Sequence, residues 1–172
     1  MLNTLWKDRL KQWTKEFVSM GLLIFIIANV FSYFRSPNLN DTNLPEISTL
    51  LTNKELFSTQ DFTNKPVLIH FWAMWCPTCK LEASNIQKLS ESYNVLSIAV
   101  RSGSDAEINA YLKENDFNFN VINDHKGILA SKFHVQAYPT TFIYNKQNTL
   151  SFSEVGYTST WGLYLRMWWA NQ

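Results

Sequence analysis

The chain has 172 residues, enough for one domain of ordinary size and a short additional segment. Hydrophobic residues make up 46% of it and aromatic residues 15%, which excludes a disordered chain and favours a packed core. The net charge is +1, but residues 1–35 hold five basic and two acidic side chains, whereas residues 36–172 hold ten and twelve. The nearly neutral body argues against a nucleic-acid-binding surface.

A stretch without any charged side chain occupies residues 17–34 near the N-terminus. As a helix it would be roughly 27 Å long, close to the thickness of the hydrocarbon layer of a bilayer. Lysine and arginine residues precede it and only Arg35 follows, and such charges stay on the cytoplasmic side of a membrane. The sequence therefore predicts a cytoplasmic segment at residues 1–16, a transmembrane signal anchor at residues 17–35 and an exported body.

Two other interpretations of this stretch stay open, namely a cleaved signal peptide and a helix buried in a core. Val30, Phe31 and Tyr33 are large, whereas a cleavage site requires small side chains there, so the anchor is favoured. Residues 36–45 are polar and contain prolines near both ends, which predicts a linker. The globular domain is then expected at residues 46–172.

Strands and helices are expected to alternate along this domain. Strands are expected at residues 66–72, 94–100 and 119–124 and in a hairpin of 140–145 with 150–155, and helices at 77–92, 104–116, 126–135 and 159–170. The first strand is an apolar run suited to burial on both faces. This order predicts an α/β domain with a mixed central sheet and helices on both faces.

The expected helix at residues 77–92 has an apolar and a polar side. Its apolar side is expected to consist of Leu81, Ile86 and Leu89. Its polar residues are expected mostly to face water, and they are Lys80, Glu82, Gln87 and Lys88. On helical geometry alone, Glu82 is therefore expected to be a solvated side chain.

The only two cysteines, Cys76 and Cys79, stand between the first long strand and this helix. Pro77 is favoured in the first turn of a helix, which puts Cys76 at the helix N-terminus. Free N–H groups and the helix dipole stabilise a thiolate there, while Cys79 lies one turn further on the same face. An exposed, activated sulfur in front of a shielded one suits two-step thiol–disulfide exchange, so the sequence predicts a redox pair.

Three alternatives compete with a redox pair. A structural disulfide would close a very small loop and remove little entropy from the unfolded chain. A copper-delivery module is chemically reasonable because thiolates bind Cu(I), but His125 and His134 lack a metal-type spacing and are expected at the surface. A pure adaptor protein would leave both cysteines without a role. We therefore expect neither a metal ion nor another cofactor.

Several segments resemble one known family. VLIHFWAMWCPTCK at residues 67–80 and AYPTTFIYNK at residues 137–146 resemble the thioredoxin superfamily, and more narrowly its membrane-anchored TlpA-like branch. VINDHKGILASKFHV at residues 121–135 and GYTSTWGLYLRMWWA at residues 156–170 are similar to the ScsD type, the suppressor-of-copper-sensitivity proteins. The order of elements also suits a thioredoxin-like fold with one inserted strand–helix unit.

This resemblance implies a bacterial periplasmic thiol–disulfide oxidoreductase held in the inner membrane by residues 17–35, with its N-terminus in the cytoplasm. Its expected partners are proteins that carry disulfides or thiols, and a membrane thiol transporter of the DsbD kind as electron donor. An anchored domain in an oxidising compartment is well placed to receive such electrons, so a reductase is expected. The alternative is an oxidant that forms disulfides in its partners.

The resemblance also implies roles for individual residues around the cysteines. Cys76 is then the nucleophile and Cys79 the resolving thiol. Pro139 matches a proline in the cis form beside the active site, where its neighbour's backbone can pair with an extended peptide. The residues expected to contact substrate are Trp75, Tyr138, Pro139 and Thr140.

Two residues compete for the transfer of the proton of Cys79. Glu82 matches an acidic residue that tunes the protonation of the cysteines in the TlpA-like branch. Many thioredoxins have a buried aspartate where this chain has His70, and an imidazole could do similar work near neutral pH. A histidine that is merely satisfied in the core is an equal alternative, so the assignment stays open between Glu82 and His70.

Overall fold

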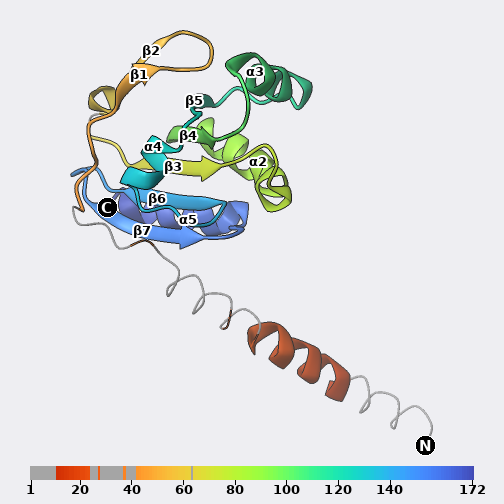
Figure 1. Cartoon of the computed structure of the whole chain (residues 1–172). Helices are drawn as coiled ribbons and strands as arrows, with labels where there is room; N and C mark the ends of the chain where they lie inside the picture. Colours follow the sequence, from red (N-terminus) through yellow and green to blue (C-terminus); the bar gives the residue numbers. More distant parts are fainter. Residues whose placement is uncertain (1–10, 24–26, 28–36, 38–41, 63) are drawn as a thin grey trace, which may run out of the picture. The chain divides into compact units, whose positions relative to one another are not determined.

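The computed structural model describes residues 11–23, 27, 37, 42–62 and 64–172 (Figure 1). The chain divides into two compact units, residues 1–35 and residues 36–172. Residues 11–23 of the first unit are helical. No helix within the described ranges combines the length and the apolar character needed to cross a membrane. The predicted cytoplasmic segment, anchor and linker all lie partly outside the described residues.

The second unit contains the strands β1 (Ser48–Leu50), β2 (Leu56–Ser58), β3 (Val67–Trp72), β4 (Asn94–Val100), β5 (Asn120–Asp124), β6 (Thr140–Tyr144) and β7 (Leu150–Val155). Its helices are η1 (Thr59–Asp61), α2 (Pro77–Ser90), α3 (Asp105–Glu114), α4 (Ile128–Lys132) and α5 (Thr160–Ala170). The elements from β3 to α5 lie where the sequence predicts them. The three elements before β3 are not predicted, because elements of three residues are too short to show a periodicity.

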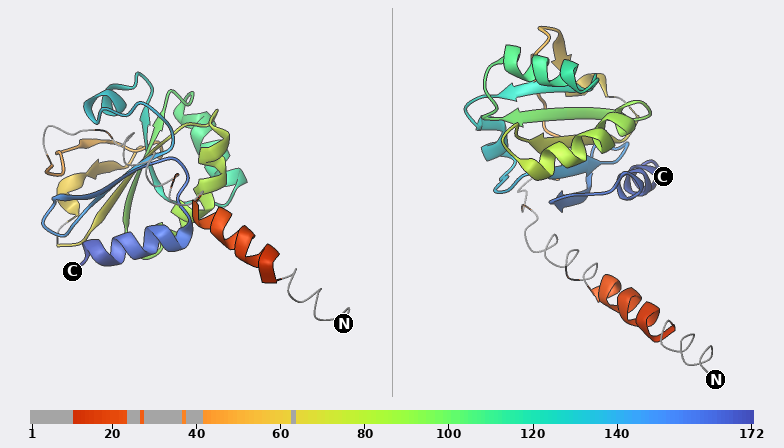
Figure 2. Two further views of the ribbon diagram at one scale, coloured as in Figure 1. Left: turned by 90° about the horizontal axis from the view of Figure 1, so that it is seen from below. Right: turned by 90° about the vertical axis from the view of Figure 1, so that its right-hand side faces the viewer.

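Strands β3 to β7 form one sheet in the order β5–β4–β3–β6–β7, and β1 pairs with β2 separately (Figures 1 and 2). The central strand β3 is parallel to β4 and antiparallel to β6, with Phe71 opposite Thr140. The predicted mixed sheet is therefore confirmed. Because β6 runs against β3, the segment that follows β3 and the segment that precedes β6 meet at the same edge of the sheet.

Both faces of this sheet are covered. All residues of β3 are buried, and successive side chains of a strand point to opposite faces. Leu68 and Trp72 pack in a cluster with residues of α2, α3 and α5, whereas Ile69 and Phe71 pack in a cluster with residues of α4 and of the β1–β2 region. The right-hand view of Figure 2 shows α4 and α5 on opposite sides of the strands. Coverage of both faces by helices is therefore confirmed.

The prediction for the buried side of α2 is confirmed for Ile86 and Leu89 and wrong for Leu81 and Glu82. The buried residues of α2 are Cys79, Glu82, Ala83, Asn85, Ile86 and Leu89. Leu81 is 72% exposed, so the prediction that Leu81 lies on the apolar side and Glu82 faces water is wrong. The helix begins at Pro77, after a turn of four residues that follows the end of β3 at Trp72, and it packs against β4 and α5. Residues three and four positions apart, counted from Cys79, then face the core.

Residues 42–44, which fall in the predicted linker, are hydrogen-bonded to the sheet at the end opposite to the start of α2. The N–H of Leu44 donates to the carbonyl of Asn148 at 2.7 Å, and the N–H of Leu150 donates to the carbonyl of Thr42 at 2.7 Å. These contacts fasten residues 42–44 to the turn between β6 and β7. This turn follows Tyr144, which pairs with Val67 at the beginning of β3.

We predict that Ile86→Ala lowers the free energy of unfolding by about 2–5 kcal/mol, because a fully buried side chain would leave a cavity. Leu81→Ala on the same helix is the matched control and should change it by less than about 0.5 kcal/mol, because Leu81 is exposed. Urea denaturation of the oxidised protein measures both values. The opposite ranking would contradict the rotation of α2.

Candidate active site

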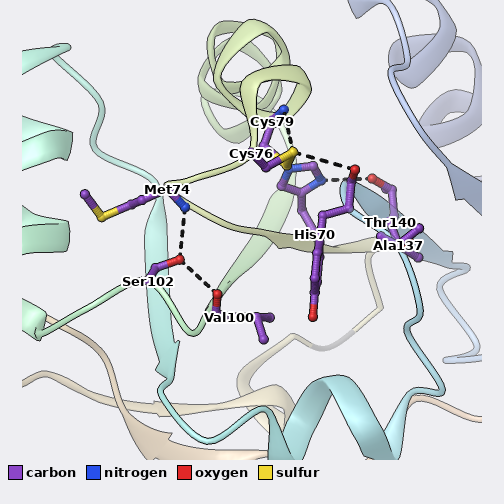
Figure 3. The surroundings of a disulfide bond; sticks show 10 residues. His70, Met74, Cys76, Cys79, Val100, Ser102, Ala137 and Thr140 are labelled. Atoms are coloured by element: carbon purple, nitrogen blue, oxygen red, sulfur yellow. Dashed lines mark hydrogen bonds between the residues drawn. A yellow bond between two sulfur atoms is a disulfide. The ribbon is translucent and has the colours of Figure 1, made fainter.

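A short turn carries the chain from β3 into α2, and neighbouring backbone groups hold it in place. The N–H of Met74 donates to the hydroxyl of Ser102 at 3.0 Å, and this hydroxyl donates to the carbonyl of Val100 at 3.0 Å (Figure 3). The N–H of Cys76 donates to the carbonyl of Ala73 at 3.1 Å. The position of Cys76 is therefore set by the ends of two adjacent strands.

Cys76 and Cys79 form a disulfide at the start of α2, with their Cα atoms 5.3 Å apart (Figure 3). Cys76 is the N-cap residue in an extended conformation, and Pro77 occupies the first turn. The N–H of Cys79 points at Cys76 Sγ over 3.2 Å. After reduction, this N–H and the positive end of the helix dipole would stabilise a thiolate on Cys76.

The two cysteines differ less in exposure than the sequence predicts. Cys76 is 6% exposed and Cys79 is 1% exposed. The carbonyl oxygen of Tyr138 lies 3.6 Å from Cys76 Sγ and helps to cover it. Cys76 is still the more accessible of the two, but the prediction of an openly exposed Cys76 is wrong for this disulfide form.

The segment before β6 lies against the disulfide. The peptide bond between Tyr138 and Pro139 is cis. Trp75 is 62% exposed, and its ring meets the ring of Tyr138 edge to face at a centroid distance of 5.7 Å. Thr140 is fully buried, and its hydroxyl donates to the carbonyl of Ala137 at 2.8 Å. Trp75 and Tyr138 therefore border Cys76 on the surface, while the side chain of Thr140 supports the loop from within.

His70 is a buried residue of β3, on the face that α2 covers. It is 2% exposed, and its Nδ1 lies 2.9 Å from the hydroxyl oxygen of Thr141 on β6. Burial disfavours the charged imidazolium and lowers the pKa of His70 to about 3. The ring is therefore neutral at physiological pH.

Glu82 is fully buried one turn after Cys79, on the same side of α2. Its Oε1 accepts a hydrogen bond from the N–H of Thr158 at 3.1 Å, and its Oε2 has no hydrogen-bond partner within the described part of the chain. Burial raises the pKa of Glu82 to about 8, against the lowering effect of the Thr158 hydrogen bond and with a smaller contribution from the charge of Glu154. The carboxyl group beside Cys79 is therefore protonated at neutral pH in this form.

The other two histidines are at the surface, as predicted. His125 is exposed with its Nδ1 3.3 Å from the carbonyl oxygen of Gly103, and His134 is exposed at the end of α4. Among the described residues, no three His, Cys, Asp or Glu side chains are grouped so that they could hold a metal ion.

Sequence reasoning misses two residues that complete the surroundings of Glu82. Asn85 is buried on α2, and its Nδ2 donates to the carbonyl of Thr158 at 3.0 Å. The spacing of three residues from Cys79 to Glu82 and from Glu82 to Asn85 could have indicated Asn85. Thr158 is 73 residues away from Asn85, and nothing near it in the sequence indicates the contact.

The sequence profile of the AhpC/TSA family matches residues 41–153. The chain belongs to the AhpC/TSA family. A thioredoxin-like protein of Haemophilus influenzae is 33% identical over 168 residues, which cover 94% of this chain and 97% of that protein. The thiol-disulfide oxidoreductase ResA of Bacillus subtilis is 26% identical over 149 residues, which cover 80% of this chain and 83% of that protein.

A solved structure shares the fold of residues in the second unit of this chain. The exposed lipoprotein thioredoxin Etrx1 of Streptococcus pneumoniae superposes with a TM-score of 0.64 at 21% identity, over 72% of this chain and 98% of that one. This member of the AhpC/TSA family therefore has a thioredoxin-like α/β fold. It is a thiol–disulfide oxidoreductase, and Cys76 and Cys79 form its CxxC active site.

We predict that the free energy of unfolding of the oxidised protein, plotted against pH, has a flat maximum because of Glu82 and His70. Folded Glu82, with a pKa of about 8 against 4.5, keeps a proton that the unfolded chain loses, so stability falls as pH rises from 4.5 to 8. Folded His70, with a pKa of about 3 against 6.5, lacks a proton that the unfolded chain binds, so stability falls as pH drops from 6.5 to 3. The two effects cancel between pH 4.5 and 6.5. Beyond this plateau each slope approaches about 1.4 kcal/mol per pH unit.

Urea denaturation at a series of pH values, without reductant, measures this profile. Glu82→Gln should remove the fall on the alkaline side, and His70→Asn should reduce the fall on the acid side, to which the lowered pKa values of Asp105 and Glu107 also contribute. An alkaline slope that persists unchanged in Glu82→Gln would show that Glu82 is not the group responsible.

Proposed function

We propose that this protein is a membrane-tethered reductase of disulfides in proteins outside the cytoplasm, of the TlpA-like ScsD type. The observation that carries the proposal is the position of Cys76, which caps α2 and lies 3.6 Å from the carbonyl oxygen of Tyr138. A partner's extended chain can pair with the backbone before Pro139 and bring its own sulfur to Cys76. Trp75 and Tyr138 would supply the aromatic surface on which that chain lies.

The exchange takes place in two steps. The thiolate of Cys76 attacks one sulfur of the partner's disulfide, so that a mixed disulfide forms and the partner's other sulfur leaves and takes up a proton. The thiolate of Cys79 then attacks Cys76 Sγ, which forms the Cys76–Cys79 bond and releases the partner's second sulfur. Two electrons pass from the dithiol to the partner, and both of the partner's sulfurs leave reduced.

Cys79 must lose its proton before the second step. The carboxylate of Glu82, one turn away on the same side of α2, is the proposed acceptor. With the disulfide formed, the pKa of Glu82 of about 8 suits a group that has just received this proton. His70, with a pKa of about 3, is a much weaker base, so we assign it the role of a neutral neighbour held by Thr141.

The proposed location is the bacterial inner membrane, with residues 17–35 as a single span, the N-terminus in the cytoplasm and the catalytic domain in the periplasm. The uncharged stretch with basic residues before it supports this orientation. The description of the pneumococcal relative as an exposed lipoprotein agrees with a family used outside the cytoplasm. A membrane thiol transporter of the DsbD kind would return two electrons to the disulfide after each cycle.

We predict that Cys79→Ala captures partner proteins as mixed disulfides, because the second step is blocked while Cys76 still attacks. Non-reducing gels of the purified periplasmic complexes, followed by mass spectrometry, identify the partners. Cys76→Ser combined with Cys79→Ala is the control and should capture none. In the wild-type protein, alkylation of thiols in cells should find mainly the dithiol; a predominant disulfide would indicate the oxidant instead.

We predict that the full chain stays in the membrane fraction after an alkaline wash, as a protein with a spanning helix does. Leu22→Arg combined with Leu23→Arg should release it, because each charge in the hydrocarbon layer costs about 2.5–3.5 kcal/mol. Leu50→Arg combined with Leu56→Arg adds the same charges to exposed positions of the domain and should leave the protein in the membrane. Release of the wild-type chain by the wash would contradict the proposed anchor.

A further inference from the structure

The segment between β7 and α5 is hydrogen-bonded to two side chains of α2, those of Asn85 and Glu82, and Asn85 makes most of these contacts. Asn85 is 7% exposed. Its Nδ2 donates to the carbonyl of Thr158 at 3.0 Å and to the hydroxyl of Tyr157 at 3.3 Å. Its Oδ1 accepts a hydrogen bond from the hydroxyl of Thr160 at 2.7 Å. Both ends of the amide are therefore used to hold residues 157–160.

The same segment covers the carboxyl group of Glu82. The N–H of Thr158 donates to Glu82 Oε1 at 3.1 Å. In the sequence, Thr158 lies between Tyr157 and Thr160, whose hydroxyls are also hydrogen-bonded to Asn85. The N–H of Gly156 donates to the carbonyl of Pro139 at 2.8 Å, so the segment is also joined to the loop beside the disulfide. Gly156 has a φ of +98°, a conformation that residues with a side chain rarely adopt.

Of the titratable side chains, one lies one turn away from Glu82 on α2 and one acts on it through its charge. Cys79 lies one turn before it on the same side of α2, and the charge of Glu154 on β7 raises its pKa. Arg166 Nε lies 2.8 Å from Glu154 Oε1, so these two charges are paired with each other. Burial is the largest influence on Glu82, ahead of the charge of Glu154. Burial therefore keeps Glu82 protonated; the segment that carries Thr158 forms one part of its cover, while the hydrogen bond from Thr158 itself lowers the pKa.

We propose that Asn85 is a positioning residue for the thiol–disulfide exchange. By holding residues 157–160 against α2, it keeps water away from the Glu82 carboxyl and preserves it as a base strong enough to take the proton of Cys79. This inference rests on the role of Glu82 proposed above.

The consequence of losing the Asn85 amide follows from its partners. The carbonyl of Thr158 and the hydroxyl of Thr160 would lose their partner inside the protein and would turn to water instead. Water that enters with them would solvate Glu82 Oε2, which has no partner among the described residues. The pKa of the carboxyl would then move down toward that of an ordinary glutamate, and the carboxylate would become a weaker base.

The test uses the full chain in its oxidised form, with Asn85→Ala as the first variant and Thr160→Val as the second. Thr160→Val replaces the hydroxyl that donates to Asn85 Oδ1 with a methyl group. Thr160→Ser keeps a hydroxyl at this position. Asn109→Ala is the matched structural control, because Asn109 on α3 also holds a distant backbone carbonyl, that of Thr52, at 2.8 Å. The readout is the ¹³C NMR titration of the Glu82 side-chain carboxyl, assigned with Glu82→Gln.

We expect Asn85→Ala and Thr160→Val to move the Glu82 midpoint down by about one pH unit or more, as water reaches the carboxyl. Thr160→Ser and Asn109→Ala should leave the midpoint at the wild-type value. If the folded Asn85→Ala and Thr160→Val variants both keep the wild-type midpoint, the inference is overturned and the role of Glu82 is unaffected.

The pH profile of the resolving step, measured by stopped flow on a preformed mixed disulfide, separates the two proposals. The inflection should move in Asn85→Ala together with the Glu82 midpoint, which supports the inference. If Glu82→Gln itself leaves the profile of the wild-type protein unchanged, the role of Glu82 is overturned, and with it the catalytic purpose of Asn85.

Discussion

The active site depends on the junction between the carboxyl end of β3 and the first turn of α2. At this point the chain leaves a fully buried strand and begins a helix at Pro77, so Cys76 becomes the helix cap with the N–H of Cys79 pointing at its sulfur. The neighbours of β3 in the sheet are β4 on one side and β6 on the other. Because β6 is antiparallel to β3, it brings Pro139 to the end of the sheet at which Cys76 lies. A single junction thus assembles the nucleophile, the helix dipole and the proline loop.

Burial has opposite effects on the two titratable groups near the disulfide, and both effects remove charge. It keeps Glu82 protonated and His70 unprotonated at neutral pH, because a low dielectric disfavours the ionised form of either side chain. An inner cysteine that must become a thiolate is poorly served by a fixed negative charge beside it. In the proposed resolving step, Glu82 becomes neutral as it takes the proton of Cys79, which avoids this repulsion when the thiolate forms. In the disulfide form neither Glu82 nor His70 holds a buried charge at neutral pH.

Local patterns predict the elements from β3 to α5, because each of these segments shows its own periodicity or turn residues, and they predict Cys76 and Cys79 as a pair. They fail where the answer depends on how elements pack. Hydrophobicity alone predicts that Leu81 faces the core. In the structure α2 packs against β4 and α5 so that Glu82 is buried and Leu81 is exposed. The contact between Asn85 and Thr158 joins residues 73 positions apart and exists only because α2 and α5 pack side by side.

The loop that borders the disulfide and the segment that covers Glu82 belong to one hydrogen-bonded unit, since Gly156 donates to the carbonyl of Pro139 and Thr158 donates to Glu82. In the proposed mechanism, partner binding and proton transfer would therefore depend on segments that are hydrogen-bonded to each other. A substitution in either segment can therefore change the geometry at Cys76, the access of water to Glu82, or both. Loss of activity in such a variant consequently identifies a binding defect only when the titration of Glu82 is unchanged, and a proton-transfer defect only when the attack by Cys76 is unchanged.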